Sequence, residues 1–297
     1  MNTFRRAALL VAVALLVGTW GSLARAVPRD TIQVFPGPHA LADALAAASP
    51  GDTLNIHPGT YPERVTVSKA NLTLKASSTT RPVIDGQCGG LYTMRVFASG
   101  VTTTGLKIQG AGYAELSYEN VPGGTVTNDV LRDTCSAEYG INLFDAGSVL
   151  VQDNRSSGFG DAALYIGGIN STPNALLRAL DNVLFNNARG IIVEDSFTQG
   201  VVIRLRGNDI HNNGKPGKAP IGGIYITNSD RVVIRANMVK DNGPMGIELN
   251  QYSDLNRVIG NTVTGHTFDL KNEAGNSGNC FSSNTYNTSQ GNVSTPC

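Results

Sequence analysis

One phrase recurs through the second half of this chain and limits what it can fold into. A short stretch with apolar residues at every second position ends in Asn, and after a gap a second such stretch often begins with Gly-Ile. The aligned asparagines, 24 to 29 residues apart, are Asn128, Asn154, Asn182, Asn208, Asn237 and Asn261. Alternation with a period of two indicates β-strands, because successive side chains of a strand point to opposite faces.

Each repeat holds three such strands, and none of them can bury its apolar face alone. Stacked repeats would share one core, so we predict an all-β solenoid of three-stranded coils. The Gly-Ile strand is expected to contribute the inward pairs Ile141/Leu143, Leu164/Ile166, Ile191/Val193, Ile224/Ile226, Ile247/Leu249 and Phe268/Leu270. The strand before each Asn would contribute Val151, Ala179, Leu205, Ile234 and Val258, and the strand after it Val130, Leu184, Ile210, Val239 and Val263. A Greek-key sandwich would not explain a register kept over six units.

The recurring Asn is expected to mark one corner of each coil. Stacked about 4.8 Å apart, identical amides can hydrogen-bond along a ladder. Asn also tolerates the left-handed backbone that a sharp corner needs. The asparagines should therefore line up along a single corner of the solenoid.

The ends of the chain read differently from the repeats. Residues 1–26 carry two arginines, a short apolar run and an Ala-Arg-Ala site, as in a cleaved signal peptide; an uncleaved membrane anchor is the alternative. In residues 27–52, Leu41 and Leu45 stand at helical spacing, which predicts a short helix capping an open end of the coil. The β-helix is assigned to residues 53–275, and a disulfide-tied cap to residues 276–297. We expect no membrane span after cleavage.

Cysteine content and charge restrict the compartment and the partners. The four cysteines, Cys88, Cys135, Cys280 and Cys297, suit two disulfides in an oxidising compartment, which predicts a secreted or periplasmic protein. Three pairings are possible, and proximity in sequence favours Cys88–Cys135 with Cys280–Cys297. A formal net charge of zero argues against a nucleic-acid partner.

Several phrases resemble a known class of proteins over the whole mature chain. "SPGDTLNIHPGTYPERVTV" resembles the opening of many right-handed parallel β-helix repeat proteins of the pectate-lyase-like superfamily, and "GDAALYIGG" and "GNCFSSNTYNTS" resemble phrases of secreted bacterial members. The resemblance implies a right-handed parallel β-helix whose Gly-Ile strands form the first sheet. It also implies that chemistry takes place on the outer face of that sheet. Signature motifs of polygalacturonases, alginate epimerases and classical pectate lyases are missing.

Strand alternation predicts which residues point outward from the first sheet. One column would hold Asn142, Tyr165, Ile192, Tyr225, Glu248 and Asp269, and a second Phe144, Gly167, Glu194, Thr227, Asn250 and Lys271. Tyrosine offers an apolar face that can stack on a sugar ring and a polar tip. The residues predicted to bind a polysaccharide are Asn142, Tyr165, Glu194, Tyr225, Glu248 and Asn250; ordinary solvated strands are the alternative.

The same face would carry the chemistry if the protein is a uronate lyase, which is the activity we expect. β-Elimination needs a base and a neutralised substrate carboxylate. The catalytic candidates are Arg189, Lys218, His211 and Asp161. Calcium could neutralise the substrate, held by Glu194, Glu248 and Asp269. A hydrolase using Asp161 or Asp195 with Glu248, and a non-catalytic carbohydrate-binding scaffold, are the alternatives.

A second stripe, of arginines, is expected on the outward side of the strand before each Asn. It consists of Arg178, Arg204, Arg206, Arg235 and Arg257. The stripe could hold an acidic polymer, but we interpret it as a solvated face, because like charges on stacked strands discourage edge pairing. The four histidines are scattered along the chain, so no transition-metal cluster is expected.

Overall fold

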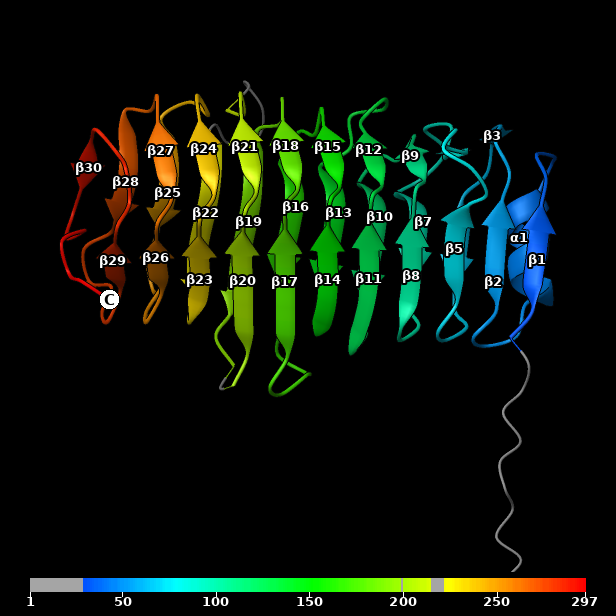
Figure 1. The fold of residues 1–297 in the computed structure, drawn as a ribbon, viewed down its shortest axis with the longest axis horizontal. Helices are drawn as coiled ribbons and strands as arrows, with labels where there is room; N and C mark the ends of the chain where they lie inside the picture. Colours follow the sequence, from blue (N-terminus) through cyan, green and yellow to red (C-terminus); the bar gives the residue numbers. More distant parts are fainter. Residues whose placement is uncertain (1–28, 199, 215–221) are drawn as a thin grey trace, which may run out of the picture.

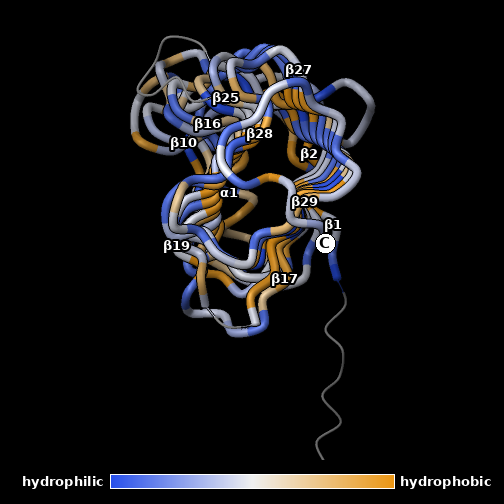
Figure 2. Tube along the Cα trace, turned by 90° about the vertical axis from the view of Figure 1, so that its left-hand side faces the viewer, coloured by the Kyte–Doolittle hydropathy of each residue, from blue (hydrophilic) through white to orange (hydrophobic). Residues whose placement is uncertain are grey.

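The chain forms a single long solenoid of stacked coils (Figure 1). The computed structural model describes residues 29–198, 200–214 and 222–297; the predicted signal peptide and Lys218 lie outside them. Every strand pair in the three sheets is parallel, so the all-β parallel β-helix predicted from the sequence is confirmed. Viewed along its axis, the coils superimpose one behind another (Figure 2).

Each coil contributes one strand to each of three sheets. The eleven-stranded sheet contains β1 (Thr31–Val34), β2 (Thr53–Ile56), β5 (Thr73–Ala76), β8 (Val101–Thr104), β11 (Gly123–Thr127), β14 (Ser148–Gln152), β17 (Leu176–Leu180), β20 (Val202–Arg206), β23 (Val232–Arg235), β26 (Arg257–Ile259) and β29 (Cys280–Ser282). The nine-stranded sheet contains β3 (Thr60–Tyr61), β6 (Val83–Asp85), β9 (Lys107–Gln109), β12 (Val130–Arg132), β15 (Arg155–Ser157), β18 (Val183–Phe185), β21 (Asp209–His211), β24 (Met238–Lys240) and β27 (Thr262–Thr264). The ten-stranded sheet contains β4 (Val65–Val67), β7 (Tyr92–Val96), β10 (Ala114–Glu119), β13 (Tyr139–Phe144), β16 (Ala162–Gly167), β19 (Arg189–Ser196), β22 (Gly222–Ser229), β25 (Met245–Leu249), β28 (Phe268–Asn272) and β30 (Ser289–Gln290).

The predicted asparagine ladder exists, with one member displaced. Its members, joined by amide hydrogen bonds of 2.9 to 3.0 Å, are Asn154, Asn182, Asn208, Asn237, Asn261 and Asn284. In the coil before them the ladder position is held by Asp129, whose backbone N–H donates to Asn154 Oδ1, so the assignment of Asn128 was wrong by one residue. The same shift makes Leu131, rather than Val130, the inward residue of β12.

The left-handed backbone lies one residue before each ladder position, contrary to expectation. Positive φ angles occur at Asn128, Asp153, Asp181, Gly207, Ala236, Gly260 and Ser283. The ladder asparagines from Asn154 to Asn261 are buried and bonded through both backbone and side chain, and Asn284 at the end is half-buried. The corner is therefore turned by the residue before the ladder, while the ladder amides satisfy the buried backbone groups that the turn leaves free.

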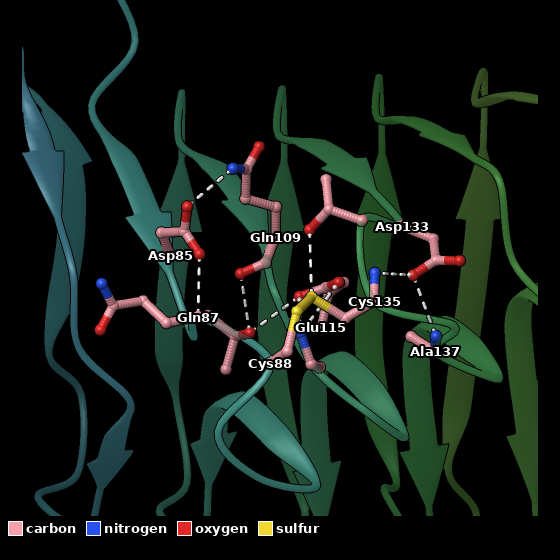
Figure 3. The surroundings of a disulfide bond; sticks show 11 residues. Asp85, Gln87, Cys88, Gln109, Glu115, Asp133, Cys135 and Ala137 are labelled. Carbon is pink, nitrogen blue, oxygen red and sulfur yellow. Dashed lines mark hydrogen bonds between the residues drawn. A yellow bond between two sulfur atoms is a disulfide. The ribbon is translucent and has the colours of Figure 1, made fainter.

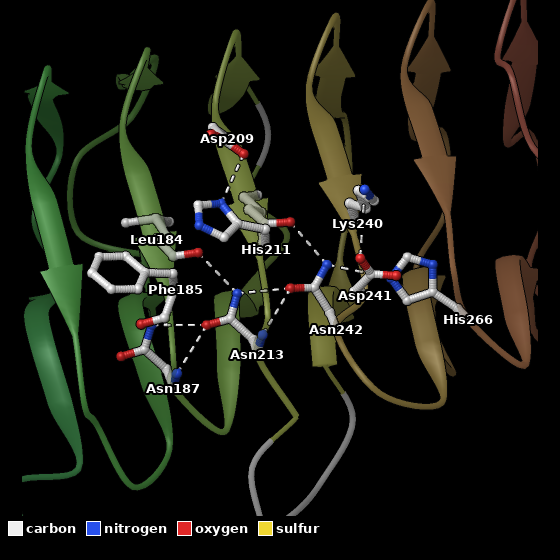
Figure 4. Close-up of polar contacts among 11 residues, drawn as sticks. Leu184, Phe185, Asn187, Asp209, His211, Asn213, Lys240, Asp241, Asn242 and His266 are labelled. Atoms are coloured by element: carbon white, nitrogen blue, oxygen red, sulfur yellow. Dashed lines mark hydrogen bonds and ion pairs between the residues drawn. The ribbon is translucent and has the colours of Figure 1, made fainter.

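A second, shorter amide ladder lines the corner between the nine- and ten-stranded sheets (Figure 4). Asn187 donates to Asn213, and Asn213 donates to Asn242, both at 2.8 Å. Asn242 then lies 3.3 Å from the Nε2 atom of His266, which ends the series. These side chains are buried, so this histidine and these amides belong to the scaffold.

The strict alternation predicted for the Gly-Ile strands breaks at the glycine. A Cβ on Gly246 would lie 2.4 Å from Val263 and 2.5 Å from the carbonyl oxygen of Asp269, so this position faces the crowded corner beside the short strand. Ile247 also faces the core, which places two successive residues on the inner side. In the last coil Phe268 pairs with Met245 and is only half-buried, so its predicted inward position was wrong.

Both ends of the solenoid are closed. Helix α1 (Ala40–Ala47) packs Leu41, Ala44 and Leu45 into the core at the first coils, as the spacing predicted.

The disulfides join Cys88 to Cys135 and Cys280 to Cys297, which confirms the pairing favoured by proximity. No helix among the described residues is long and apolar enough to cross a membrane.

Candidate functional site

The outer face of the ten-stranded sheet carries a regular column of side chains. Strand pairing places Asn142, Tyr165, Ile192, Tyr225 and Glu248 on successive rungs, as predicted. The column extends at one end through Ser117 to Arg95, and at the other end to Lys271. Lys271 was predicted in the second column, and that placement was wrong, because the register of the last coil sets it opposite Glu248.

Asp269 does not belong to this column, so its predicted place beside Glu248 was wrong. It lies opposite Gly246, where the strand turns its side chain toward the corner. Its carboxylate contacts His266 Nδ1 at 2.9 Å and accepts backbone N–H groups of Asn287 and Thr288. Burial alone would raise its pKa, but these hydrogen bonds hold the pKa of Asp269 below its usual value. Asp269 is therefore a structural carboxylate of the last coil.

Four tyrosines from successive coils form a continuous series on this face, here called the tyrosine row. The ring centroids are 5.6 Å apart for Tyr92–Tyr113, 5.3 Å for Tyr113–Tyr139 and 4.9 Å for Tyr139–Tyr165. The first two pairs meet edge to face, a preferred aromatic geometry.

Small and aliphatic residues support these rings from below. Ala114, Ala162 and Ile192 are buried in a cluster separate from the core. Tyr165 and Tyr225 are among the tyrosines that pack against this cluster. Ile192 therefore does not interrupt the face; it is covered by tyrosines. Burial raises the pKa of Tyr92 to about 12, so this phenol stays protonated at neutral pH.

The centre of the face holds a linked group of charged and phenolic side chains. Arg189 pairs with Asp161, and Tyr139 donates its hydroxyl proton to the same carboxylate at 2.9 Å. The Arg189 guanidinium also lies over the Tyr225 ring, 5.3 Å from its centroid. Burial first, and then Asp161, raise the pKa of Tyr139, so it is a proton donor in the resting protein.

A similar network continues toward the N-terminal end. Arg95 pairs with Glu119, which also accepts the hydroxyl proton of Ser117 at 2.7 Å. Although burial would raise it, these hydrogen bonds hold the pKa of Glu119 below its usual value. Asn142 donates its amide to Ser117 at 2.8 Å.

Three polar atoms on this face lack partners although they are buried. They are Arg95 Nε, Asn142 Oδ1 and Arg189 Nε. In the described parts of the chain, every other buried side-chain nitrogen or oxygen has a hydrogen-bond partner. A buried unpartnered polar atom costs about 1–3 kcal/mol. All three lie on one face of one sheet, where ordered water or a ligand would supply the missing hydrogen bonds.

At the C-terminal end of the column, acids and a lysine neutralise one another. Lys271 contacts Glu248 at 2.9 Å and also pairs with Glu273, and Asn250 donates to Glu248 at 3.3 Å. Glu194 instead accepts the hydroxyl proton of Tyr165 at 3.2 Å, two strands away from Glu248. With Asp269 turned to the corner, the three predicted calcium ligands do not converge.

A cleft of about 690 Å³ opens beside the start of the tyrosine row. Tyr92 and Arg95 line it, together with α1 and the loop of residues 86–91. The disulfide Cys88–Cys135 ties that loop to the segment leading into β13, next to the buried Glu115 (Figure 3). The crosslink therefore fixes one wall of the cleft relative to the sheet.

Comparison with models of known protein families identifies the family of this chain. Residues 75–295 match the NosD family, described as periplasmic copper-binding protein. The chain belongs to the NosD family. No curated protein matches it by sequence.

Solved structures similar to this NosD-family chain show the same fold. Pectate lyase Pel9A superimposes with a TM-score of 0.70 at 16% identity, over 91% of this chain and 79% of that one. An alginate lyase from Paenibacillus sp. str. FPU-7 gives 0.63 at 18% identity, over 89% and 99%. The A-module of the Azotobacter vinelandii mannuronan C-5 epimerase AlgE4 gives 0.56 at 14% identity, over 90% and 89%.

The described residues of this NosD-family chain hold no cluster of His, Cys, Asp and Glu that fits a copper site. Copper sites use thiolate, thioether and imidazole ligands. All four cysteines are in disulfides, and no three residues among His, Cys, Asp and Glu gather at one place in residues 29–198, 200–214 and 222–297. No step proposed below uses copper.

The structure separates the four catalytic candidates. Arg189 and Asp161 lie together on the candidate face, whereas His211 lies on β21 of the nine-stranded sheet, where it stacks on Phe185 and contacts Asp209 at 2.9 Å (Figure 4). Lys218 lies outside the described residues.

Sequence reasoning missed Tyr92, Tyr113, Tyr139 and Arg95. The three tyrosines come three or four residues before the outward residues Arg95, Ser117 and Asn142, in "LYTMRV", "GYAEL" and "EYGIN". The signal was a Tyr at the start of, or one residue before, each of three successive strands. Strict alternation would have placed Tyr139 inward, and only the break at the glycine turns it out.

Proposed function

We propose that the outer face of the ten-stranded sheet binds an acidic polysaccharide. The tyrosine row would stack on successive sugar rings, since an aromatic face suits the apolar face of a sugar and the phenol can hydrogen-bond. Arg95 and Arg189, one toward each end of the row, would hold carboxylates, for which a guanidinium is well shaped. A polymer lying along the solenoid axis would meet both.

The observation that carries this proposal is the tyrosine row, whose rings contact one another on a single face, with the Arg95 guanidinium over Tyr92 and the Arg189 guanidinium over Tyr225. The unpartnered Arg95 Nε, Asn142 Oδ1 and Arg189 Nε are buried, so a ligand would reach them only through ordered water or a shift of these side chains. Structures similar in fold include a pectate lyase, an alginate lyase and a mannuronan epimerase, which supports a polysaccharide as the ligand class.

We further propose that the protein is secreted or periplasmic. The family description names a periplasmic protein, and disulfides persist in oxidising compartments. Polysaccharides bearing carboxylates would be met there as extracellular polymers.

Elimination is the reaction to test on this face. Arg189 would neutralise the substrate carboxylate, Asp161 would accept the proton from the neighbouring carbon, and Tyr139 would protonate the leaving oxygen as its bond to carbon breaks. The proton on Asp161 would then return to Tyr139, whose hydroxyl lies 2.9 Å from that carboxylate. Tyr139 cannot also be the base while its pKa stays raised, and Asp161 is already paired with Arg189, so the site described here supports binding more strongly than cleavage. A binding protein without catalysis is the alternative.

Binding is tested with polygalacturonate and alginate, using neutral dextran as the control polymer. We expect Tyr165→Ala to weaken binding of the acidic polymers by about tenfold or more, because an aromatic contact of the tyrosine row is lost. The matched control is Tyr286→Ala, which removes an exposed tyrosine from the C-terminal cap. Isothermal titration calorimetry measures both variants.

Equal affinities of the two variants would contradict the proposed face, and absence of binding to any acidic polymer would contradict the ligand class. The same polymers are then followed by the ultraviolet absorbance of unsaturated products, with and without calcium. Products that disappear in Arg189→Gln would support elimination; binding without products would support the non-catalytic alternative.

A further inference from the structure

A second surface, on the eleven-stranded sheet, is lined by arginines. Arg178, Arg204, Arg206, Arg235 and Arg257 border a groove of about 470 Å³, together with Leu180 and Val233. All five arginines are exposed. This set is called the arginine groove.

Strand pairing brings these side chains onto neighbouring rungs. Arg178 pairs with Arg204 across β17 and β20, and Arg206 pairs with Arg235 across β20 and β23. Arg257 follows on β26, opposite Val233. The four strands stand side by side along the solenoid axis (Figure 1). The strand register therefore places the charges in two adjacent lines parallel to that axis, one with Arg178, Arg204 and Arg257 and one with Arg206 and Arg235.

The groove has no acidic partners of its own. None of the five guanidinium groups forms an ion pair or a hydrogen bond within the described ranges. The whole chain has 23 basic and 23 acidic residues, so the positive charge here is a local excess. Like charges about 5 Å apart repel one another, which is unfavourable unless an anion is bound.

Protection of a sheet edge does not explain the arginines. Charged residues guard strands whose N–H and C=O groups are unpaired. Here β17, β20, β23 and β26 are all interior strands, each bonded to a neighbour on both sides. The interpretation of the stripe as a solvated, edge-protecting face therefore loses its main support.

We propose that the arginine groove binds a linear anionic polysaccharide, independently of the tyrosine row. A groove with charges in line fits a chain whose carboxylate or sulfate groups repeat along its length. Arginine also offers paired donors to such groups, which lysine cannot. A flat anionic membrane would touch the rim of a groove and leave its floor empty, so a polymer is the better fit.

The test measures retention of the full chain on immobilised heparin, a sulfated and carboxylated polysaccharide, over a series of salt concentrations. We expect Arg178→Gln with Arg204→Gln and Arg206→Gln to weaken binding about tenfold or more and to reduce its salt dependence. The control triple variant, Lys75→Gln with Arg132→Gln and Lys240→Gln, removes the same charge from exposed positions elsewhere. Circular dichroism checks that both variants are folded.

A third variant, with lysine at the same three arginine positions, keeps the charge and should bind with intermediate strength. Tyr286→Ala, in the C-terminal cap and outside both surfaces, should leave heparin retention unchanged. Tyr165→Ala and the triple arginine variant are measured separately: a loss of retention in the arginine variant assigns heparin to the groove, and a loss seen only in Tyr165→Ala would overturn the groove. Equal loss in the control triple variant would overturn the proposal by showing a non-specific charge effect. Binding to vesicles containing phosphatidylglycerol, without retention on heparin, would overturn it in favour of a membrane.

Discussion

Asp129 is a carboxyl group at a position where the following coils carry an amide. It is fully buried, and it accepts hydrogen bonds from the Thr103 hydroxyl and the Leu106 backbone N–H. Burial raises its pKa to about 7 in spite of these bonds. The folded chain therefore holds a proton here that the unfolded chain releases near pH 4.

This raised pKa makes stability depend on pH at a single residue. The contribution of the protonated Asp129 is present below about pH 4 and is lost as the pH rises through about 7. We expect Asp129→Asn to be more stable than the native chain at pH 8 by roughly 1–3 kcal/mol, with the difference shrinking by pH 5. Urea unfolding at the two pH values measures it.

If the two proteins differ in free energy of unfolding by the same amount at pH 5 and pH 8, Asp129 is ionised in the folded chain at both pH values. Burial lowers the pKa of His266, so the stability that its neutral form gives the fold is lost as the pH falls. His266 is present in both proteins, so this contribution cancels when their free energies of unfolding are compared.

Single residues also mark where sequence reasoning stopped. The period-two pattern placed Asn142, Tyr165 and Glu248 correctly, because each follows the first inward Ile or Leu of its strand. It misplaced Asp269, which comes before its apolar partner and falls at the break in alternation. Nothing in the pattern of apolar residues shows that break; the close approach of the neighbouring coil causes it.

At the scale of elements, the asparagine ladder holds the strands in register. Each side chain accepts two hydrogen bonds from the coil before and donates to a carbonyl of that coil and to the next amide. The fold was predictable from this repeat because one residue type returns at nearly fixed intervals. The lengths of the loops between the strands vary, and for that reason the site was less predictable.

We expect Asn208→Ala to lower the free energy of unfolding by about 3 kcal/mol, because it leaves the buried backbone N–H of Asn182 without a partner and reduces the Asn182 side-chain amide to its one bond to the Val151 carbonyl. The control is Asn284→Ala at the half-buried end of the ladder, for which we expect about 1 kcal/mol. Urea unfolding followed by far-ultraviolet circular dichroism compares them. A larger loss in Asn284→Ala would mean that the ladder does not stabilise the middle of the solenoid.

At the scale of the molecule, the two disulfides act in different places. Cys280–Cys297 holds the last segment over the final coil, where Phe281 and Val293 join the core. Cys88–Cys135 holds loops beside the first coils instead. In a solenoid each coil contacts only its neighbours, so the effect of losing a crosslink should stay local.

We expect Cys280→Ser with Cys297→Ser to increase amide hydrogen exchange in β26–β30 and to leave β13–β22 unchanged, with a stability loss of about 3 kcal/mol for the closing segment. The matched variant, Cys88→Ser with Cys135→Ser, should increase exchange near residues 86–91 and 133–138. Exchange that rises along the whole solenoid in either variant would show that the molecule unfolds as one unit.

The tyrosine row is assembled from successive coils, and successive coils are 23 to 29 residues apart in the chain where the ladder joins them. Gain or loss of one complete coil would thus lengthen or shorten the platform by a single step of about 4.8 Å while leaving the interior intact. Duplication of the segment that encodes one coil would therefore change the length of this surface in fixed steps, without a change in any existing contact.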